Sequence, residues 1–282
     1  MLRRIARSPK ALWSLVALGV IVAAAIFGPS FWSASPTFGD FGNIMAFPSP
    51  EHPLGTDSLG RDTLARLLTG LRVTLVVALF VEVINVALGV TVGLLAAYYG
   101  GMIDQLLSRV TDLLFAFPGL LFAILIAGVF GPAVSETYGG MGRLMLTTGA
   151  LALIGWPMMA RYVRGMVLSL KSSQFAEAAS AMGASDAYIM RNVLLRNAVG
   201  MVAVTATLDI SGVIISEATL SLLGLGIQQP AASLGLMIND ARSYIGTNFT
   251  QVLFPGLVIV ALVLVFSFLG DGLRDVLDPK SR

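Results

Sequence analysis

The run VTLVVALFVEVINVALGVTVGLLAAY, residues 73–98, decides the fold class. A helix needs about 20 consecutive apolar residues to cross the hydrocarbon core of a bilayer, and this run is longer than that. Glu82 is its only charged residue, and the run contains no proline that would interrupt a helix. Because hydrocarbon offers no hydrogen-bond partners, such a segment satisfies its own backbone as a helix. The run therefore predicts a transmembrane helix.

The composition of the whole chain also indicates a membrane environment. Of the 282 residues, 56% are hydrophobic and 12% are charged, and the mean hydropathy is +0.84. Such a chain has too little polar surface to cover a soluble globule of this length. Further apolar runs have spanning length, which predicts an all-α polytopic membrane protein with six transmembrane helices, at about residues 12–32, 73–98, 113–130, 144–160, 198–218 and 252–270.

The basic residues predict how these helices are oriented. A cytoplasmic N-terminus places the segments before residue 11, 101–112, 161–197 and after residue 271 inside, and these hold 13 Lys or Arg residues against 5 elsewhere. Cytoplasmic segments carry such an excess, so we expect both termini inside, in the inner or plasma membrane. The run Ala23-Ala24-Ala25 would also suit a signal peptide, but the first apolar stretch exceeds the roughly 7–15 residues of a signal core.

Several classes of function lack the residues that they need. The chain has no Cys and a single His, His52, which excludes thiol chemistry and Cys/His metal clusters, and His52 has no second soft ligand nearby for nickel. The hydrolase motifs H-E-x-x-H and G-x-S-x-G are absent from the sequence. The basic residues lie at the ends of apolar runs rather than in one block, so nucleic acid is not an expected partner.

The longest internal loop carries a pattern that suits docking. Glu177-Ala178-Ala179 is followed four residues later by Gly183. Gly183 permits a tight helix end, and Ser185 or Asp186 can cap the next helix, so we expect two short helices joined at 183–186. The small side chains of the first helix leave a low surface that can lie closely against another protein.

This loop resembles the EAA loop of ATP-binding-cassette importer permeases, the coupling helix that fits a groove on the ATPase. The family pattern usually ends in Leu-Pro with a His before it, whereas this chain has Leu195-Arg196 and Val193. The resemblance assigns ATPase coupling to Glu177, Ala178, Ala179, Gly183, Ala184, Ser185, Asp186 and Leu195.

Longer matches extend the resemblance over nearly the whole chain. They are similar to the dipeptide, oligopeptide and nickel permease group, in particular to its C-type subunit. Leu234 stands where that group often has a Trp. The four matching stretches are 52–62 (HPLGTDSLGRD), 98–104 (YYGGMID), 217–226 (EATLSLLGLG) and 270–279 (GDGLRDVLDP).

The resemblance implies a type I ABC importer permease fold and a set of partners. These are a second homologous permease in a heterodimer, two cytoplasmic ATPase subunits, an extracytoplasmic solute-binding protein and membrane lipid. The chain lacks the phosphate-binding G-x-x-x-x-G-K-[ST] loop, and none of Lys10, Lys171 and Lys280 follows a Gly. We therefore expect ATP and Mg on the partner ATPases, and neither a cofactor nor a catalytic residue in this chain.

The resemblance also bears on domain organisation and cargo. Residues 1–282 are expected to form one transmembrane permease domain, with a core at about 72–272 and with the N-terminal tail, the first span and an external segment in 1–71. The solute implied is a dipeptide or an oligopeptide, with nickel or another solute of the same family as the alternative.

Polar residues within predicted spans are candidates for the transport pathway, because lipid cannot solvate a charge. Asp209, Gly212 and Ser216 share one helix face by their spacing, which suits either pathway lining or a paired structural role. An ion relay through Glu82 and Asp209 would fit a secondary carrier, whose mark of two related halves is not seen. The intramembrane carboxylates are Glu82, Asp209 and Glu217.

Two of these carboxylates carry further expectations. Glu217 falls near the external end of its span, where we expect an interfacial, hydrated carboxylate. Glu82 is expected to be buried against a neighbouring helix, with Asn85 one turn later as its hydrogen-bond partner. Separately, proline interrupts helix hydrogen bonding, which predicts kinks in or beside the spans at Pro118, Pro157 and Pro255.

Overall fold

The computed structural model describes residues 9–277, and its regular structure is helical. Within those residues the one bridge outside the helices pairs Thr56 with Asp62. The predicted all-α fold is confirmed. In chain order the helices are α2 (Pro9–Phe31), η1 (Phe41–Asn43), α3 (Thr63–Tyr99), α4 (Gly101–Phe115), α5 (Gly119–Lys171), α6 (Gln174–Ala181), α7 (Asp186–Tyr188), η2 (Ile189–Leu195), α8 (Arg196–Leu222), α9 (Leu234–Ala241), η3 (Arg242–Tyr244) and α10 (Thr250–Leu277).

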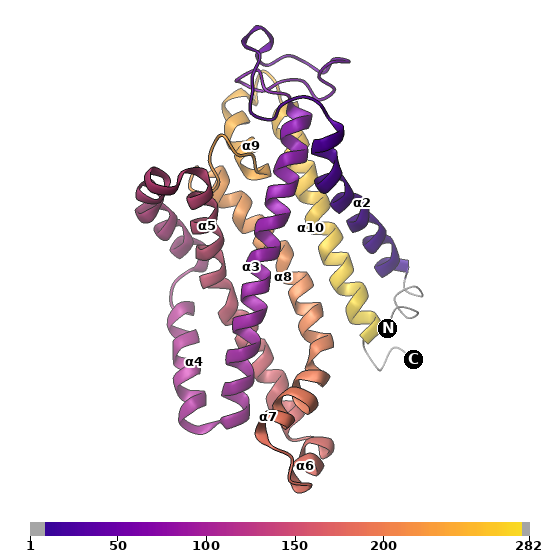
Figure 1. Ribbon diagram of the computed structural model, residues 1–282, viewed down its shortest axis with the longest axis vertical. Coiled ribbons are helices and arrows are strands. Elements are labelled where there is room, and N and C mark those ends of the chain that lie inside the picture. The colour runs from indigo at the N-terminus through magenta and orange to yellow at the C-terminus, as the bar shows by residue number, and fades with distance from the viewer. Residues whose placement is uncertain (1–8, 278–282) are drawn as a thin grey trace.

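Local signals fix both ends of α3, the helix at the centre of the molecule (Figure 1). At its start the Asp62 carboxylate accepts a hydrogen bond from the Ala65 backbone N–H at 2.7 Å, which satisfies a donor that has no partner within the helix. At its end Gly100 and Gly101 have φ angles of 66° and 52°. Side chains disfavour that left-handed region, so the glycine pair reverses the chain directly into α4.

Five helices in the described residues are long and apolar enough to cross a membrane: α2, α3, α5, the helical stretch 186–222 and α10. The sequence predicted six spans. Two of them, 113–130 and 144–160, fall largely within α5, which is broken at Gly139 by non-helical angles of φ 60° and ψ −150°. The predicted span 113–130 also crosses the junction between α4 and α5, where Pro118 precedes α5, so the proline predicted to kink a span instead lies between two helices.

The helices run between two distinct ends of the molecule (Figure 1). The loop 32–62 and α9 lie at one end, here called the loop end, and α6 and α7 lie at the other. Near the end of α10, Gly272 lies against Ala11 of α2, and Leu277 lies against Gly200 at the start of α8. The start of α2 and the end of α10 are therefore neighbours, on the side from which α8 begins.

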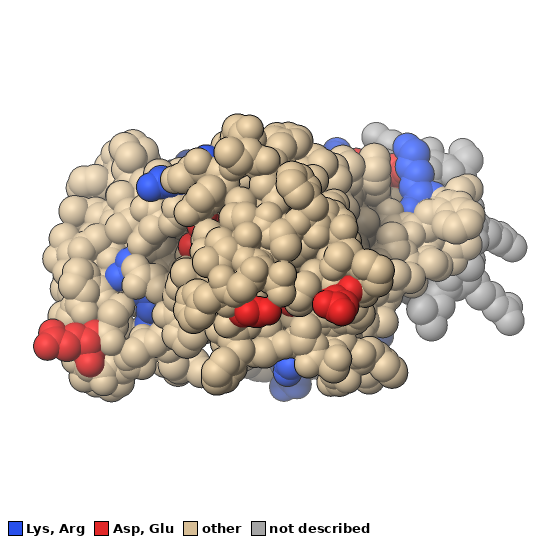
Figure 2. Space-filling view, turned by 90° about the horizontal axis from the view of Figure 1, so that it is seen from above, with Lys and Arg blue, Asp and Glu red and all other residues tan. Residues whose placement is uncertain are grey.

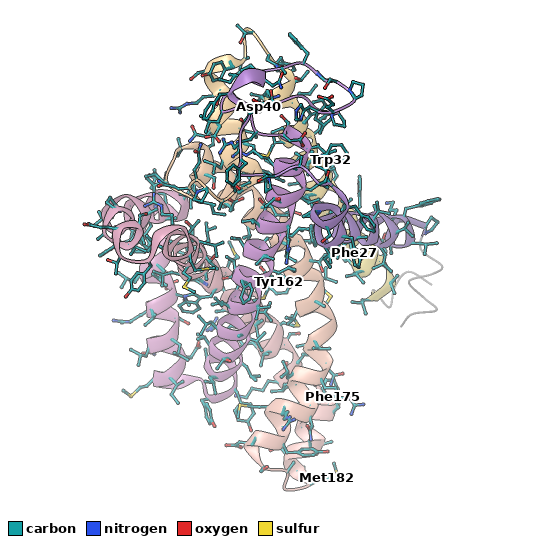
Figure 3. The ribbon with its side chains drawn as sticks, turned by 45° about the horizontal axis from the view of Figure 1, so that its top comes forward. Phe27, Trp32, Asp40, Tyr162, Phe175 and Met182 are labelled. Carbon is teal, nitrogen blue, oxygen red and sulfur yellow. The ribbon has the colours of Figure 1, made fainter. Side chains whose placement is uncertain are left out.

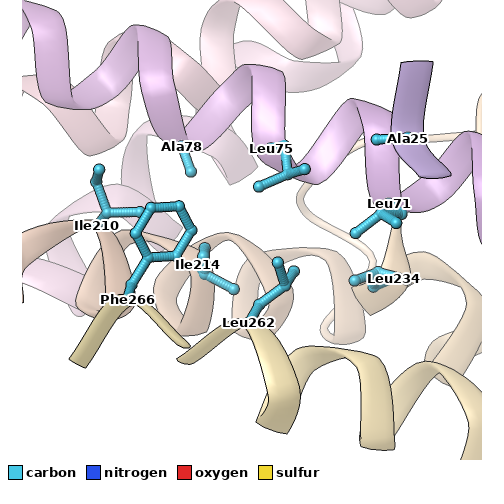
Figure 4. Close-up of a cluster of buried hydrophobic side chains, with 9 residues drawn as sticks. All are labelled: Ala25, Leu71, Leu75, Ala78, Ile210, Ile214, Leu234, Leu262 and Phe266. Carbon is cyan, nitrogen blue, oxygen red and sulfur yellow. The ribbon is translucent and has the colours of Figure 1, made fainter. Parts of the chain in front are cut away.

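The main apolar core holds α2, α3, α8, α9 and α10 together (Figure 4). Burying these side chains away from lipid adds little, because lipid is itself apolar, so close van der Waals contact carries the association. The cluster consists of Ala25, Leu71, Leu75, Ala78, Ile210, Ile214, Leu234, Leu262 and Phe266.

Helices α3 and α5 approach each other closely through glycines one turn apart on α3. A Cβ built on Gly89 would lie 2.5 Å from the Met159 side chain, and one on Gly93 would lie 2.5 Å from the Ala160 carbonyl oxygen. Gly89 and Gly93 form a G-x-x-x-G pair, which lets the backbones of two helices come together in a membrane. The α3–α5 contact therefore requires the missing side chains.

Gly93→Ala is expected to destabilise the protein, because the new methyl group meets backbone rather than a flexible side chain. Forcing one methyl group into such a contact costs about 1–3 kcal/mol, so the thermal midpoint of the purified protein in detergent should fall. Gly149→Ala on α5 is the matched control, since a Cβ there meets nothing within 4 Å. Equal midpoints for the two variants would contradict the close α3–α5 contact.

Candidate transport pathway and coupling loop

The coupling loop forms the two short helices that the sequence predicted. Helix α6 ends in a turn in which Gly183 has φ +80°. The Gly183 N–H donates to the Ser180 carbonyl at 2.9 Å, and the Ala184 N–H donates to the Ala179 carbonyl at 3.1 Å. This pair of bonds satisfies the last carbonyls of the helix and needs a left-handed residue at the position of Gly183. Ser185 then caps α7 by accepting from the Tyr188 N–H, so the predicted cap and glycine turn are confirmed.

Helix α6 divides its small residues between the interior and the surface. Ala176 and Ala179 are buried and pack in one apolar cluster with Val163 and Val167 of α5. Glu177 and Ala178, by contrast, are exposed. Ala179 therefore anchors the predicted EAA residues on the inner face, and Glu177 and Ala178 are exposed on the outer face.

Apolar side chains that the motif does not include also face outward on this loop. Phe175 is 46% exposed and Met182 is 81% exposed, and Figure 3 shows both at the far tip of the molecule. Tyr188 is exposed beside them. Residues 175, 178 and 182 follow the spacing of one helix face, a signal in the sequence that would have found this stripe. We call α6, α7 and the turn 182–185 the coupling knob.

The coupling knob continues into α8 without a break. Arg196, at the position of the family's usual Pro, has helical angles of φ −60° and ψ −35°, so the backbone passes from α7 through the π-helical turn η2 into α8. Leu194 is fully buried in η2, while Leu195 and Val193 are half-buried. The absence of proline leaves a single long helical stretch from the coupling knob to the far end of α8.

Tyr98 of α3 contacts both the coupling knob and α5. The Tyr98 hydroxyl donates to the Asp186 carboxylate of the knob at 2.8 Å, and the Lys171 ammonium at the end of α5 donates to the Tyr98 carbonyl at 2.5 Å. Arg164 of α5 makes a two-pronged pair with Asp104 of α4 at 2.5 and 2.6 Å. Tyr98 and Asp104 belong to the matching stretch 98–104, which thus fastens α3 to the coupling knob and α4 to α5.

Midway along the bundle the predicted polar face of α8 lines an open groove of about 670 Å³. Asp209, Gly212 and Ser216 all line it, together with Asn85 of α3. Ser216 donates to the Gly212 carbonyl at 2.8 Å within its own helix. We call this the central groove. Its apolar walls are Phe115, Leu151, Ile154, Met158 and Val213.

Glu82 is buried close to the central groove. Its side chain is 4% exposed, and neither carboxylate oxygen has a hydrogen bond of standard geometry within the described residues. The predicted burial is confirmed, and Asn85 lies near enough to act on the Glu82 carboxylate, as predicted. Asn85 is itself 2% exposed, and its Oδ1 atom is also unpartnered.

Glu217 is not the interfacial, hydrated carboxylate that its sequence position suggested. It is fully buried and accepts hydrogen bonds from Ser221 of its own helix at 2.7 Å and from Thr74 of α3 at 3.2 Å. Ser233 donates to the Ser221 hydroxyl at 3.3 Å, which links α9 to the same network. Partners supplied by α3 and α9 allow the carboxylate to leave water, so Glu217 joins α3, α8 and α9 rather than the central groove.

The chain resembles known transport proteins along most of its length. Residues 89–282 match the family described as the binding-protein-dependent transport system inner membrane component, and residues 1–49 match the N-terminal TM domain of oligopeptide transport permease C. The chain belongs to this family of permeases.

Curated relatives and solved structures agree with that assignment. The chain is 36% identical over 280 residues to the dipeptide transport system permease protein DppC of Alkalihalophilus pseudofirmus, covering 99% of this chain and 89% of that protein. It is 39% identical to the glutathione transport system permease protein GsiD of Pectobacterium atrosepticum, covering 93% and 88%. The inward-facing MetNI methionine ABC transporter shares the fold, with a TM-score of 0.60 at 23% identity over 76% of this chain and 97% of that chain.

The family assignment confirms a multi-pass permease of the inner membrane.

The matching stretch 52–62 forms a compact cap at the loop end of the permease. Gly55 and Gly60 have φ angles of 76° and 71° there, and a Cβ on either would fall within 2.3 Å of a backbone carbonyl oxygen. His52 lies 2.8 Å from Asp62, the residue that caps α3. The Trp32 indole donates to the same carboxylate at 3.0 Å.

A buried charge cluster locks this cap of the permease onto α9. Asp57 pairs with Arg61 at 2.7 Å and with Arg66 at 2.5 Å. Both arginines also form salt bridges with Asp240 of α9, which is far from them in the sequence. Because these charges pair with one another, the surface seen from the loop end shows few charged side chains (Figure 2). Burial would raise the pKa of Asp57, but the Arg66 charge and the backbone amides of Arg61 and Leu59 outweigh it and hold the pKa below its ordinary value.

The charge cluster predicts how the stability of the permease depends on pH. A carboxylate with a depressed pKa in the folded state stabilises the fold above its unfolded pKa, and this contribution is lost as the pH falls below about 4. The thermal midpoint should therefore show no effect of Asp57 between pH 7 and pH 5 and a decline below about pH 4.

Asp57→Asn should abolish that acid-dependent component and lower stability at neutral pH by up to about 3 kcal/mol, because two buried arginines lose a partner. Glu51→Gln removes the same charge from an exposed position in the same loop and should behave as the parent. A midpoint unchanged in Asp57→Asn at pH 7 would contradict the role of the cluster.

Proposed function

We propose that this chain is a permease subunit of an ATP-binding-cassette importer for di- or oligopeptides or closely related solutes. Two features of the same bundle together support this proposal. The coupling knob exposes apolar side chains at one end, and the central groove is lined by Asp209 and Ser216 midway along the helices. The similarity to dipeptide and glutathione permeases supports a peptide-type cargo. Nickel or another small solute is the alternative cargo.

ATP hydrolysis is proposed to occur on two partner ATPase subunits, which bind ATP and Mg. This chain has no phosphate-binding loop, so it acts as a mechanical subunit rather than as an enzyme. Phe175, Ala178 and Met182 offer an apolar surface with Glu177 at its side, which suits a groove on an ATPase. Closure of the ATPase pair would move the coupling knob and, through the unbroken helical stretch 186–222, the wall of the central groove.

The pathway is proposed to form between this chain and a second homologous permease. The central groove is open in the single subunit, so a second membrane subunit would supply its other wall. An extracytoplasmic solute-binding protein would deliver cargo at the loop end. Both termini and the coupling knob would then face the cytoplasm.

Cysteine labelling tests this orientation. The chain has no native Cys, so Ser58→Cys at the loop end and Ser180→Cys on the coupling knob each give a unique thiol. An impermeant thiol reagent on intact spheroplasts should label Ser58→Cys only, and both variants should react after membrane disruption. Labelling of Ser180→Cys in intact spheroplasts would reverse the proposed topology.

Gly183 variants test the coupling role of the knob. A Cβ at Gly183 meets nothing within 4 Å, so substitutions act through its left-handed backbone alone, at a cost of about 1 kcal/mol or more for a branched side chain. Gly183→Val should distort the coupling knob, reduce co-purification of the ATPase by about fivefold or more and lower transport-coupled ATP hydrolysis. Gly183→Asn should retain more of both, because Asn tolerates the left-handed conformation.

Gly246→Val is the matched control, since Gly246 lies in an open loop-end position without a positive φ. It should retain ATPase binding. If Gly183→Val inserts at the parental level and still binds and stimulates the ATPase normally, the knob is not the coupling element.

A further inference from the structure

Two carboxylates lie near the midpoints of membrane helices. Asp209 lies thirteen residues from either end of α8, and Glu82 is near the midpoint of α3. They are close enough for their charges to interact. No Lys or Arg is among the residues that line the central groove in the described part of the chain, and neither carboxylate has an ion-pair partner there.

The buried polar atoms at this place are hydrogen-bond acceptors left without a donor. Both carboxylate oxygens of Glu82 and Oδ1 of Asn85 are unpartnered, and both side chains are more than nine-tenths buried. Leaving such groups unsatisfied costs free energy. A native fold retains them when something that is absent from the isolated subunit supplies the donors.

The position of Asn85 is built by the neighbouring helix. A Cβ at Gly155 of α5 would lie 2.4 Å from the Asn85 amide nitrogen, so only glycine there leaves room for the amide beside the central groove. Ser216 donates to its own helix and so presents a further acceptor. The groove thus combines the Asp209 carboxylate with neutral acceptors above apolar walls.

We propose that the central groove binds the ammonium group of the transported solute, with Asp209 and Asn85 as its acceptors. This inference rests on the proposed import function and names the chemical class of its cargo. An ammonium carries three donors and no acceptor, which complements this set of atoms. A hard metal cation would need about six oxygen ligands, and the described residues contain no group of three His, Cys, Asp or Glu placed to hold a metal.

The apolar walls of the central groove indicate that the ligand also has an apolar part. Ile154 and Met158 line the groove beside the polar atoms, so a side chain of the solute can lie against them while its ammonium faces Asp209. A small peptide with a free N-terminus has both features. Its N-acetylated form keeps the apolar part and loses the charge, and is therefore the discriminating probe.

The reaction rate of a cysteine in the central groove reports the charge of the groove and does not depend on transport. Ser216→Cys is introduced into the full chain, purified with cysteine-free partner subunits in lipid nanodiscs. The modification rates by 2-aminoethyl and 2-sulfonatoethyl methanethiosulfonate are compared, each normalised to its rate with 2-mercaptoethanol. The ammonium reagent should be favoured, and Asp209→Asn should reduce the ratio by roughly tenfold, as expected for one unit charge near the thiol.

Protection by peptides tests the ligand class in the same sample. Dialanine should slow the modification of Ser216→Cys, whereas N-acetyldialanine should not, and Asp209→Asn should abolish the difference. Glu136→Gln is the matched control, because it removes one exposed carboxylate outside the groove and should leave the ratio within about twofold.

Different results would contradict the ammonium site and the import function. A reagent ratio unaffected by Asp209→Asn, or equal protection by dialanine and N-acetyldialanine, overturns the ammonium site even if the complex imports peptides on ATP. Selective protection by dialanine, with no ATP-driven uptake of it by the same complex, supports the site and overturns the proposed import function. Asp209 has no partner to lose, so Asp209→Asn tests the site without disturbing the fold.

Discussion

Hydrocarbon cannot satisfy a hydrogen bond or solvate a charge, and the rest of this structure follows from that constraint. The backbone bonds are closed within long helices, and helices meet where glycines allow their backbones to approach. Charges gather at the loop end, where Asp57 and Asp240 neutralise Arg61 and Arg66. Glu217 obeys the same constraint through hydroxyl donors from α3 and α8. Against this background the unpartnered atoms of Glu82 and Asn85 stand out as places where the isolated subunit is incomplete.

The coupling knob and the central groove are mechanically linked because they share helices and a core. Ala176 and Ala179 of the knob pack in the same cluster as Met159 and Val163 of α5. Met158, the residue before Met159, and Gly155, one turn before it, line the central groove. Helix α8 connects the two directly, since no proline interrupts the chain at Arg196. A displacement of α6 by a partner therefore reaches the groove through packed side chains rather than through a flexible loop.

The features that the sequence predicted are those set by local chemistry. Apolar runs locate the helices, and Gly183 and Ser185 fix the ends of α6 and α7 whatever the rest of the chain does. The polar stripe of Asp209 and Ser216 was likewise predicted, because helical spacing alone puts both on one face.

The features that the sequence did not predict depend on distant partners. The hydration of Glu217 was misjudged because its partner Thr74 lies 143 residues away in the chain. The cap cluster was missed because Asp240 lies 174 residues from Arg66. The break at Gly139 left no signal that distinguishes it from glycines inside helices, and so the third and fourth spans were not seen as segments of one broken helix.

The energy source is the point at which an ATP-driven permease and an ion-coupled carrier differ most. The decisive measurement is uptake of a labelled dipeptide into proteoliposomes that contain this chain with its partner permease, ATPases and binding protein. ATP is supplied on the ATPase side, and proton and sodium gradients are imposed or collapsed independently. For an ATP-driven permease, dipeptide uptake should require ATP and every subunit and should persist without an ion gradient. Uptake by this chain without the ATPases, driven by a proton or sodium gradient and insensitive to ATP, would contradict it.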